Sequence, residues 1–152
     1  MKKFSFAQPL TPDMCGKQPK MQPPAAFMLF QNAASLHAEA IGNGTAALAE
    51  RDCYWVATHS KIDFYSDANL MDMLTISTWV NPAMPNAVRG YRGYDIFVGD
   101  KQIAEGLTEW VVLNRETGFV RFSEFGFPDD FEFQDYQACG GKLCRFRDEF
   151  TD

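Results

Sequence analysis

The sequence PPAAFMLFQNAASLHAEAIG, residues 23–42, decides the fold, because it is the one long stretch with helical character. Pro24 suits a first helical turn, where its missing N–H costs nothing, and Gly42 supplies a C-terminal stop. Most residues between them are good helix formers. An apolar stripe recurs at helical spacing: Phe27, Phe30, Ala34 and Ile41. We therefore expect one long helix that is buried on most of its sides.

The remainder of the chain is rich in strand patterns. In residues 70–80, Leu74 and Ile76 alternate with Ser77 and Trp79, so the two sets face opposite sides of a strand. Further strands are predicted at residues 3–10, 53–65, 88–98, 102–114 and 119–122. Most of the turns between them are short, which favours antiparallel pairing. The pattern predicts an α+β fold in which a curved antiparallel sheet wraps around one long helix.

The composition is that of one domain with an unusual C-terminal extension. Of the 152 residues, 46% are hydrophobic and 14% aromatic, so a sizeable core is available. We assign residues 1–122 to the domain and residues 123–152 to an aromatic and acidic extension. More than half of the fourteen phenylalanines lie from Phe119 onward, and so many rings would not be left in water. We expect the extension to pack on the domain or on a second subunit.

Charge and patterning exclude several classes of function. The net charge of −6 argues against nucleic acid as a partner, since a phosphate backbone requires a basic surface. No stretch approaches the roughly 20 apolar residues of a membrane span, and the N-terminus lacks the apolar run of a signal peptide. We expect a cytoplasmic protein with four free thiols. Cys139 and Cys144 lack a second cysteine pair or a nearby histidine, so no metal is predicted.

Several segments resemble the acyl–acyl-carrier-protein (acyl-ACP) thioesterase family. Residues 30–42 (FQNAASLHAEAIG) resemble the family's helix, which carries Gln, Ala and His in this order and ends in Leu/Ile-Gly. Residues 75–79 (TISTW) look like the family's Thr-Trp strand, and Arg92, the turn at Gly99 and residues 103–114 follow the family's order. The resemblance covers roughly residues 3–122 and implies the hotdog fold.

The resemblance also implies how such a chain assembles. Many members carry two hotdog repeats in one chain, with the catalytic residues in the second repeat. This chain has room for one repeat, and that repeat resembles the first. A lone hotdog unit normally pairs its sheet with a second copy. A homodimer, or a dimer of dimers, is therefore expected.

The loop before the helix supplies the first catalytic candidate. Asp13 to Gly16 (DMCG) resembles the Asp-x-x-Gly loop of single-domain hotdog acyl-CoA thioesterases, in which the aspartate serves as base or nucleophile. Thioester hydrolysis needs an activated water or an attacking carboxylate, and N–H donors for the developing oxyanion. The start of a helix offers such donors. We predict that Asp13 is catalytic; the alternative is an ordinary turn aspartate.

The helix carries a second group of candidates. Gln31, Asn32 and Ser35 are polar residues on an otherwise apolar helix and need partners there. They could hold the catalytic water or the thioester carbonyl, with Gln31 and Asn32 in the catalytic role and Ser35 binding substrate. The alternative is that they bond to loop backbone or to a dimer mate. For His37 we expect a structural hydrogen bond to the connector after the helix, and for His59 an exposed or paired position.

Substrate contacts follow from the same picture. Lys17 and Lys20, with Gly16, lie beside Asp13 and could meet the phosphates of CoA or phosphopantetheine; the alternative is a solvated loop. An acyl chain would lie in a tunnel between helix and sheet. Its expected lining is aromatic and apolar: Phe27, Met28, Phe30, Trp55, Trp79 and Trp110.

Together these features predict an acyl thioester hydrolase of fatty acid metabolism that acts on acyl-ACP or acyl-CoA and needs no cofactor. The alternative is a non-catalytic hotdog protein that binds acyl chains or assembles with a partner. A third possibility, a hotdog dehydratase or hydratase, would need a catalytic histidine in a loop beside an acid. Neither His37 nor His59 meets that requirement.

Overall fold

The structure, a computed structural model, describes residues 3–124 and 127–143. Its strands are β1 (Phe4–Pro9), β2 (Cys53–Phe64), β3 (Met73–Val80), β4 (Arg89–Val98), β5 (Lys101–Asn114) and β6 (Gly118–Phe119). Its α-helices are α1 (Pro23–Ala40) and α2 (Thr45–Ala49), and its short 3-10 helices are η1 (Pro12–Met14), η2 (Phe122–Glu124) and η3 (Ala138–Gly141). Within these ranges no helix has both the length and the apolar character needed to cross a membrane.

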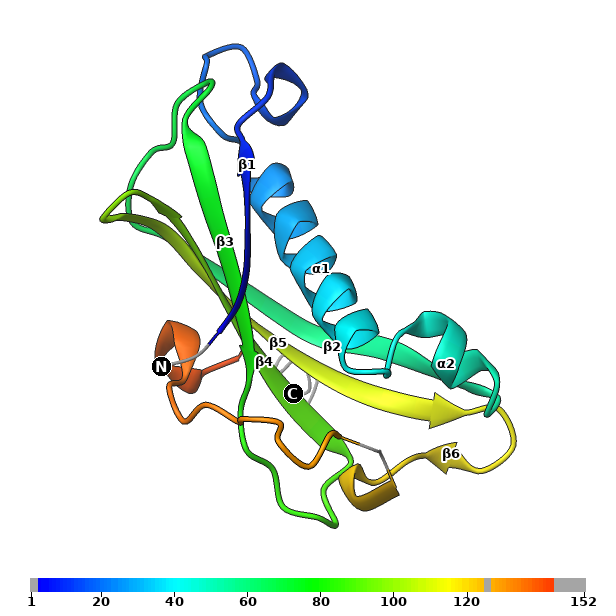
Figure 1. The fold of residues 1–152 in the computed structure, drawn as a ribbon. Helices are drawn as coiled ribbons and strands as arrows, with labels where there is room; N and C mark the ends of the chain where they lie inside the picture. The colour runs from blue at the N-terminus through cyan, green and yellow to red at the C-terminus, as the bar shows by residue number, and fades with distance from the viewer. Residues whose placement is uncertain (1–2, 125–126, 144–152) are drawn as a thin grey trace, which may run out of the picture.

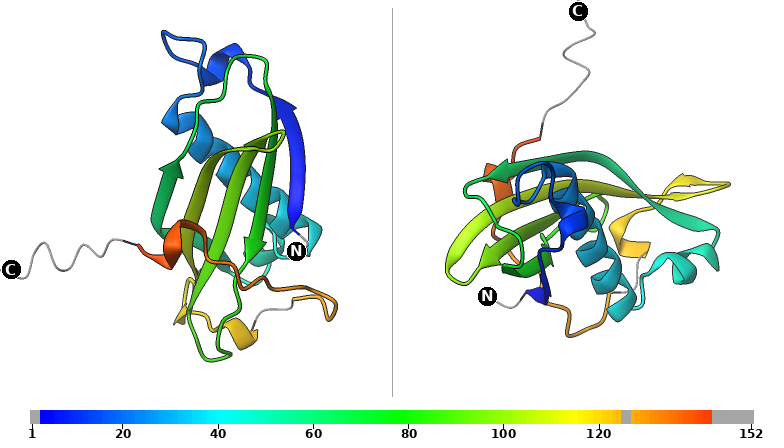
Figure 2. Two further views of the ribbon diagram at one scale, coloured as in Figure 1. Left: turned by 90° about the vertical axis from the view of Figure 1, so that its left-hand side faces the viewer. Right: turned by 90° about the horizontal axis from the view of Figure 1, so that it is seen from above.

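The strands form one antiparallel, six-stranded sheet in the order β1-β3-β4-β5-β2, with β6 beside β5. The sheet curves around α1, which lies across one of its faces (Figures 1 and 2). The chain is therefore the α+β fold predicted from the sequence, a curved antiparallel sheet around one long helix. The two edges of the sheet are β1 and β2.

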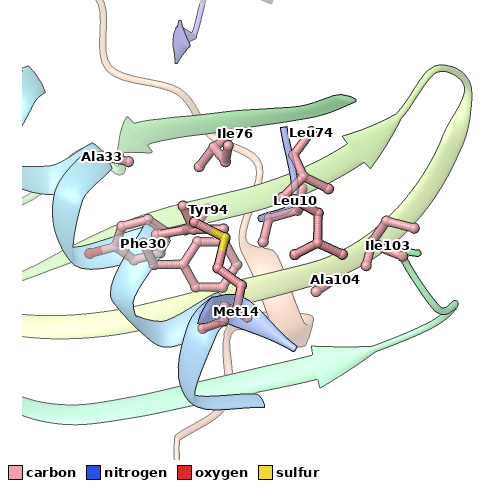
Figure 3. Close-up of a cluster of buried hydrophobic side chains, with 14 of the residues drawn as sticks. Leu10, Met14, Phe30, Ala33, Leu74, Ile76, Tyr94, Ile103 and Ala104 are labelled. Carbon is pink, nitrogen blue, oxygen red and sulfur yellow. The ribbon is translucent and has the colours of Figure 1, made fainter. Parts of the chain in front are cut away.

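The main core lies between α1 and the inner, helix-facing side of the sheet (Figure 3). The Phe30 ring stacks on Tyr94, with the ring centroids 4.9 Å apart. Gly106 of β5 makes room for this pair, because a Cβ at that position would lie 2.6 Å from the Phe30 ring. Small residues on the helix, including Ala26 and Ala33, are fully buried and let α1 approach the sheet closely.

Only one face of α1 is buried, so the expectation of burial on most sides is wrong. Phe27, Met28 and Leu36 are 43%, 42% and 49% exposed. The predicted stripe fails at Phe27 because the sheet packs against a narrow, alanine-rich face of the helix instead. Since a single sheet can cover only one side of a helix, the opposite face of α1 is left as an exposed apolar surface.

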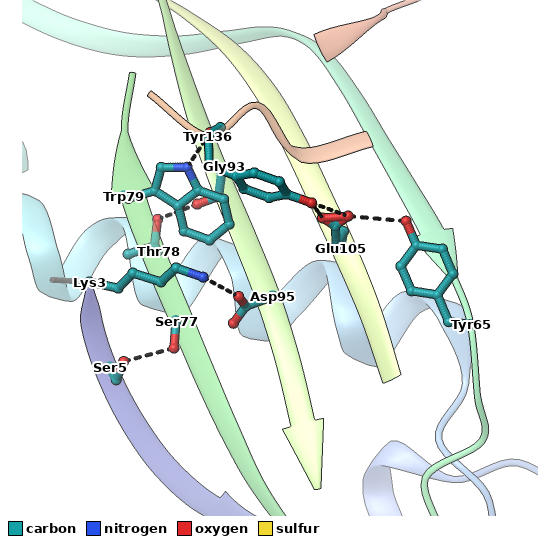
Figure 4. Close-up of polar contacts among 10 residues, drawn as sticks. All are labelled: Lys3, Ser5, Tyr65, Ser77, Thr78, Trp79, Gly93, Asp95, Glu105 and Tyr136. Carbon is teal, nitrogen blue, oxygen red and sulfur yellow. Dashed lines mark hydrogen bonds and ion pairs between the residues drawn. The ribbon is translucent and has the colours of Figure 1, made fainter. Parts of the chain in front are cut away.

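The described part of the C-terminal extension begins on the α1 side of the sheet, where Phe131 stacks on His37, and then crosses the outer face, opposite α1 (Figures 1 and 4). The indole Nε1–H of Trp79 donates a hydrogen bond to the Tyr136 carbonyl at 2.8 Å. Asn81 donates to the carbonyls of Gln134 and Tyr136, both at 2.8 Å. Trp79 also packs with Leu107, Ala138 and Cys139 in a second buried cluster. Residues 125–126 and 144–152 of the extension lie outside the described residues.

Three buried carboxylates lie on this outer face: Asp95, Glu105 and Glu109. The Lys3 ammonium pairs with Asp95 at 2.7 Å, and the hydroxyls of Tyr65 and Tyr136 donate to Glu105 (Figure 4). Glu109 accepts hydrogen bonds from the hydroxyls of Thr58 and Tyr91. Each carboxylate is thus compensated by its own partners, as buried charges must be. Among the described residues, no group of three or more His, Cys, Asp or Glu is arranged to hold a metal ion.

Candidate active site

A cavity of about 330 Å³ lies between the C-terminal half of α1 and the inner face of the sheet. We call it the helix–sheet cavity. On the helix side it is lined by residues one and two turns apart, among them Gln31, Ala34, Ser35 and Ala38. On the sheet side it is lined by residues of four strands: Trp55, Val80, Arg92 and Trp110.

Two tryptophans form the apolar wall of the helix–sheet cavity. The rings of Trp55 and Trp110, on paired strands β2 and β5, meet edge to face with centroids 6.2 Å apart. The Trp55 Nε1–H donates to the Asn43 carbonyl at 2.8 Å, which fixes the orientation of its ring. Gly90 lets the Phe122 ring close another side, since a Cβ at Gly90 would collide with that ring. Such walls suit an aliphatic chain.

The polar residues of α1 divide between the cavity and the exposed helix face. Gln31 and Ser35 both line the cavity, because residues four apart lie on the same side of a helix. Asn32 is exposed and does not line it. Phe30 lies in the core stack with Tyr94 rather than in the cavity, and Phe27 is on the open face of the helix.

His37 and Arg92 form a partly buried polar contact beside the cavity. The Arg92 Nη1–H donates to His37 Nδ1 at 2.8 Å and to the Thr78 hydroxyl at 3.2 Å. The His37 ring lies between the rings of Phe4 and Phe131, with centroids 5.0 and 5.7 Å away. Burial, and next the Arg92 charge, lower the pKa of His37 to about 4, so the ring is neutral at pH 7. The bond is to Arg92, not to the connector.

The Asp13 loop lies at the other end of α1. Asp13 is exposed in η1, and its carboxylate accepts a hydrogen bond from the Thr11 hydroxyl. The loop that follows β1 lies at the N-terminal end of α1 (Figure 1). Gly16 and Lys17 are exposed, and Lys20 pairs with Asp67 at 3.1 Å. An 18-residue helix is about 27 Å long, so within one copy this loop and the helix–sheet cavity are well separated.

Trp79 does not line the helix–sheet cavity, because the pleat of β3 directs its ring to the outer face. Arg92, Tyr91 and Phe122 line the cavity, although their place there is not predicted from the sequence. The sequence does contain a signal for Arg92: with a spacing of two residues, it shares the buried side of a strand with Tyr94 and Ile96. A charged residue in such a register is a candidate functional residue. The sequence around Phe122 has no pattern that predicts a position in the wall of the cavity.

The fold is that of known thioesterases. A probable thioesterase from Bartonella henselae has a TM-score of 0.70 at 18% identity, covering 79% of this chain and 98% of that one. An acyl-ACP thioesterase from Bacteroides thetaiotaomicron gives 0.69 at 16% identity, covering 86% and 57%. The 12:0-ACP thioesterase from Umbellularia californica gives 0.67 at 16% identity, covering 78% and 48%. This chain thus spans about half the length of the last two proteins.

The family follows from the sequence match. The model of the acyl-ACP thioesterase N-terminal domain matches residues 2–121. The chain belongs to the acyl-ACP thioesterase family, which confirms the resemblance seen in its sequence and, with it, the function class of acyl thioester hydrolase. Comparison with curated proteins gives no match.

Proposed function

We propose that two copies of this chain form an acyl thioesterase that hydrolyses fatty acyl thioesters of ACP or CoA, with the acyl chain in the helix–sheet cavity. The observation that carries this proposal is the cavity itself, where an apolar wall built on Trp55 and Trp110 adjoins the polar Gln31 and Ser35. The proposal includes a cytoplasmic role in fatty acid metabolism. The described cysteines, which are free thiols, fit a reducing compartment: Cys15, Cys53 and Cys139.

Two features support a second copy as the partner. The twelve-residue strand β2 pairs with β5 on one side only and is an edge of the sheet, where unpaired backbone groups favour pairing with another strand. The apolar face of α1 with Phe27, Met28 and Leu36 is exposed and needs cover. A two-fold partner would bury the same surfaces on both copies.

A two-fold arrangement also gives the Asp13 loop a place in the reaction. If the two α1 helices run antiparallel across the axis, the N-terminal end of one lies beside the C-terminal half of the other. Asp13 of one copy would then face the helix–sheet cavity of its partner, with Gly16, Lys17 and Lys20 near the entrance for the phosphates of the carrier. Asn32, exposed in one copy, would be covered at the same interface.

In this site each residue has a defined task. Asp13 would activate the water or attack the thioester carbonyl, and backbone N–H groups at the start of α1 would stabilise the oxyanion. Gln31 and Asn32 would hold the water or the carbonyl, and Ser35 would position the substrate. Lys20 remains available to bind the carrier phosphates, because its ion pair with Asp67 is solvent-exposed and weak.

Thiol release from decanoyl, lauroyl and palmitoyl thioesters of CoA and ACP tests the activity. We expect release by the wild type and a fall in kcat of at least about a hundredfold in Asp13→Asn, since general acid–base groups contribute about 10²–10⁴. Asp100→Asn, in the exposed turn after β4, is the matched control and should be unaffected. Full activity in Asp13→Asn would move the catalytic role to Gln31 and Asn32.

The second candidate is a non-catalytic protein that binds acyl chains or assembles with a partner. It is favoured by one observation: the family match is to the N-terminal domain alone. Acyl-chain binding without thiol release from any of these thioesters would support it over the enzyme.

The dimer has its own test. Leu36→Glu places a charge on the open face of α1, where a monomer tolerates it because the side chain is exposed. We expect the wild type to sediment as a dimer and Leu36→Glu as a folded monomer, because a buried, unpaired charge at an interface costs several kcal/mol. Met84→Glu, in the exposed loop between β3 and β4, should stay dimeric. A wild type that sediments as a monomer at micromolar concentration would refute the dimer.

A further inference from the structure

Arg92 is a charged residue in an apolar setting. It lies on the inner face of β4, in register with the fully buried Tyr94 and Ile96, and its side chain is only 9% exposed. Burial lowers the pKa of Arg92, as expected for a desolvated cation. Its hydrogen bonds to described residues go to neutral groups, the His37 ring and the Thr78 hydroxyl.

No described carboxylate pairs with this guanidinium. The buried Asp95, Glu105 and Glu109 belong to the opposite face of the sheet and have their own partners. Glu39 lines the same cavity as Arg92, but it is exposed and its carboxylate lies against Gly44. A buried charge without a counter-charge is strongly unfavourable, so Arg92 is suited to bind an anion that the described residues do not supply.

The guanidinium retains donors for such an anion. It carries five N–H groups, and the two contacts to His37 and Thr78 both use Nη1. Among the described side chains, every nitrogen or oxygen that is fully enclosed has a hydrogen-bond partner. Since no described group bonds to Nε or Nη2, both nitrogens keep some accessible surface, and Arg92 lines the helix–sheet cavity.

The surroundings define what the anion is attached to. A planar guanidinium fits a carboxylate through two parallel hydrogen bonds, and His37 and Thr78 fix its orientation. Trp55 and Trp110 provide the wall for an aliphatic chain. We propose that the helix–sheet cavity binds a carboxylate at the end of an aliphatic chain through Arg92. This inference rests on the proposed function, since the same cavity is taken to hold the acyl group.

The carboxylate that binds Arg92 could come from two sources. One is the carboxylate of the fatty acid that hydrolysis releases, which would make the free acid a product inhibitor. The other is a second carboxylate at the far end of a dicarboxylic acyl group, which would make such thioesters preferred substrates. In both cases the carboxylate is ionised at neutral pH and can pair with the Arg92 guanidinium.

Calorimetric titration of the wild type with decanoate and decanol tests the site without any variant. The two ligands share a ten-carbon chain and differ in charge. We expect decanoate to bind about ten- to hundredfold more tightly, as a hydrogen bond to a buried charge implies. Equal affinities for decanoate and decanol would overturn the proposal while leaving the cavity as the acyl site.

Variants of Arg92 and Arg89, both on β4, test whether Arg92 causes the preference for decanoate over decanol. Arg92→Met should lose the preference for decanoate and keep its affinity for decanol, whereas Arg92→Lys should keep part of the preference. Arg89→Met is the matched control, because Arg89 is exposed and pairs with Glu109 on the outer face. Undiminished decanoate binding by a folded Arg92→Met protein would overturn the proposal. If Arg92→Met does not fold, the wild-type comparison still decides.

Hydrolysis kinetics then distinguish the two sources of the carboxylate, and they also test the carboxylate site separately from the proposed enzyme activity. A higher kcat/KM for the mono-CoA thioester of decanedioate than for decanoyl-CoA, abolished in Arg92→Met, supports the dicarboxylic source. Equal rates, with inhibition by decanoate that Arg92→Met relieves, support the released acid. Arg92-dependent binding of decanoate by a protein that hydrolyses no thioester would support the carboxylate site and refute only the enzyme.

Discussion

Ala34→Leu is expected to be as stable as the wild type and yet to hydrolyse long-chain thioesters about ten- to hundredfold more slowly in kcat/KM. Ala34 lines the helix–sheet cavity, so the added carbons enter empty space. They would displace two or three methylenes of the acyl chain, at about 0.8 kcal/mol each, and every 1.4 kcal/mol is tenfold in affinity. Rates measured from octanoyl to palmitoyl thioesters should show the longest chains losing most.

The neighbouring residue provides the control. Ala33 is fully buried in the core between α1 and the sheet and does not line the cavity. Ala33→Leu should therefore overpack the core and lower the free energy of unfolding by about 1–3 kcal/mol, measured by urea denaturation. Equal destabilisation of the two variants would show that the space beside Ala34 is not available. An unchanged chain-length profile in a stable Ala34→Leu protein would place the acyl chain elsewhere.

The sheet could be predicted from the sequence because strand patterns are local. Alternation in residues 70–80 predicts that Leu74 and Ile76 face one side and that Ser77 and Trp79 face the other. In the structure the first pair packs in the core with α1, while Trp79 packs on the outer face. The end of the helix was also visible, since Gly42 adopts a φ of +81° that suits glycine after a helix.

The faces of α1 could not be predicted in the same way. Apolar residues surround most of this helix, so hydrophobic spacing alone cannot say which side the sheet covers. Side-chain size decides which face of α1 packs on the sheet. The alanines of one face allow close packing, whereas Phe27 and Leu36 are too large for it. The predicted stripe followed hydrophobicity and therefore included Phe27.

The candidate site was only partly predictable because it joins residues that are distant in sequence. Gln31 and Ser35 could be singled out as polar residues on an apolar helix. The contact between His37 and Arg92 joins residues 55 positions apart, and Trp55 meets Trp110 only through the pairing of β2 with β5. The catalytic role of Asp13 stays a prediction, whose test is thiol release by Asp13→Asn.

The largest stability effect is expected on the outer face, where Trp79→Ala should lower the free energy of unfolding by about 3–5 kcal/mol. The Trp79 side chain is almost fully buried, and its N–H satisfies the Tyr136 carbonyl. The Lys3 ammonium lies 4.2 Å from its ring centroid, which adds a cation–π contact. Trp79→Phe keeps a ring but loses the hydrogen bond, so it should cost distinctly less. Denaturant unfolding of the three proteins gives the comparison.

A second substitution tests whether the indole acts through the contact seen in the structure. The ring of Trp79 lies against Gly93, where a Cβ would collide with it, so Gly93→Ala should destabilise the wild type by about 1–3 kcal/mol. In the Trp79→Ala background the ring is gone, and Gly93→Ala should cost little. The double-mutant cycle should therefore give a coupling energy of about 1–3 kcal/mol.

Gly106→Ala is the control for this cycle, because its Cβ would meet Phe30 on the inner face of the sheet. It should also destabilise the protein, but its effect should add to that of Trp79→Ala, since the two residues have no shared partner. Additive behaviour of Gly93→Ala as well would show that Trp79 does not pack on β4 as described. Coupling at Gly93 together with additivity at Gly106 would assign the stabilisation to the outer face, where Trp79 joins the sheet to the C-terminal extension.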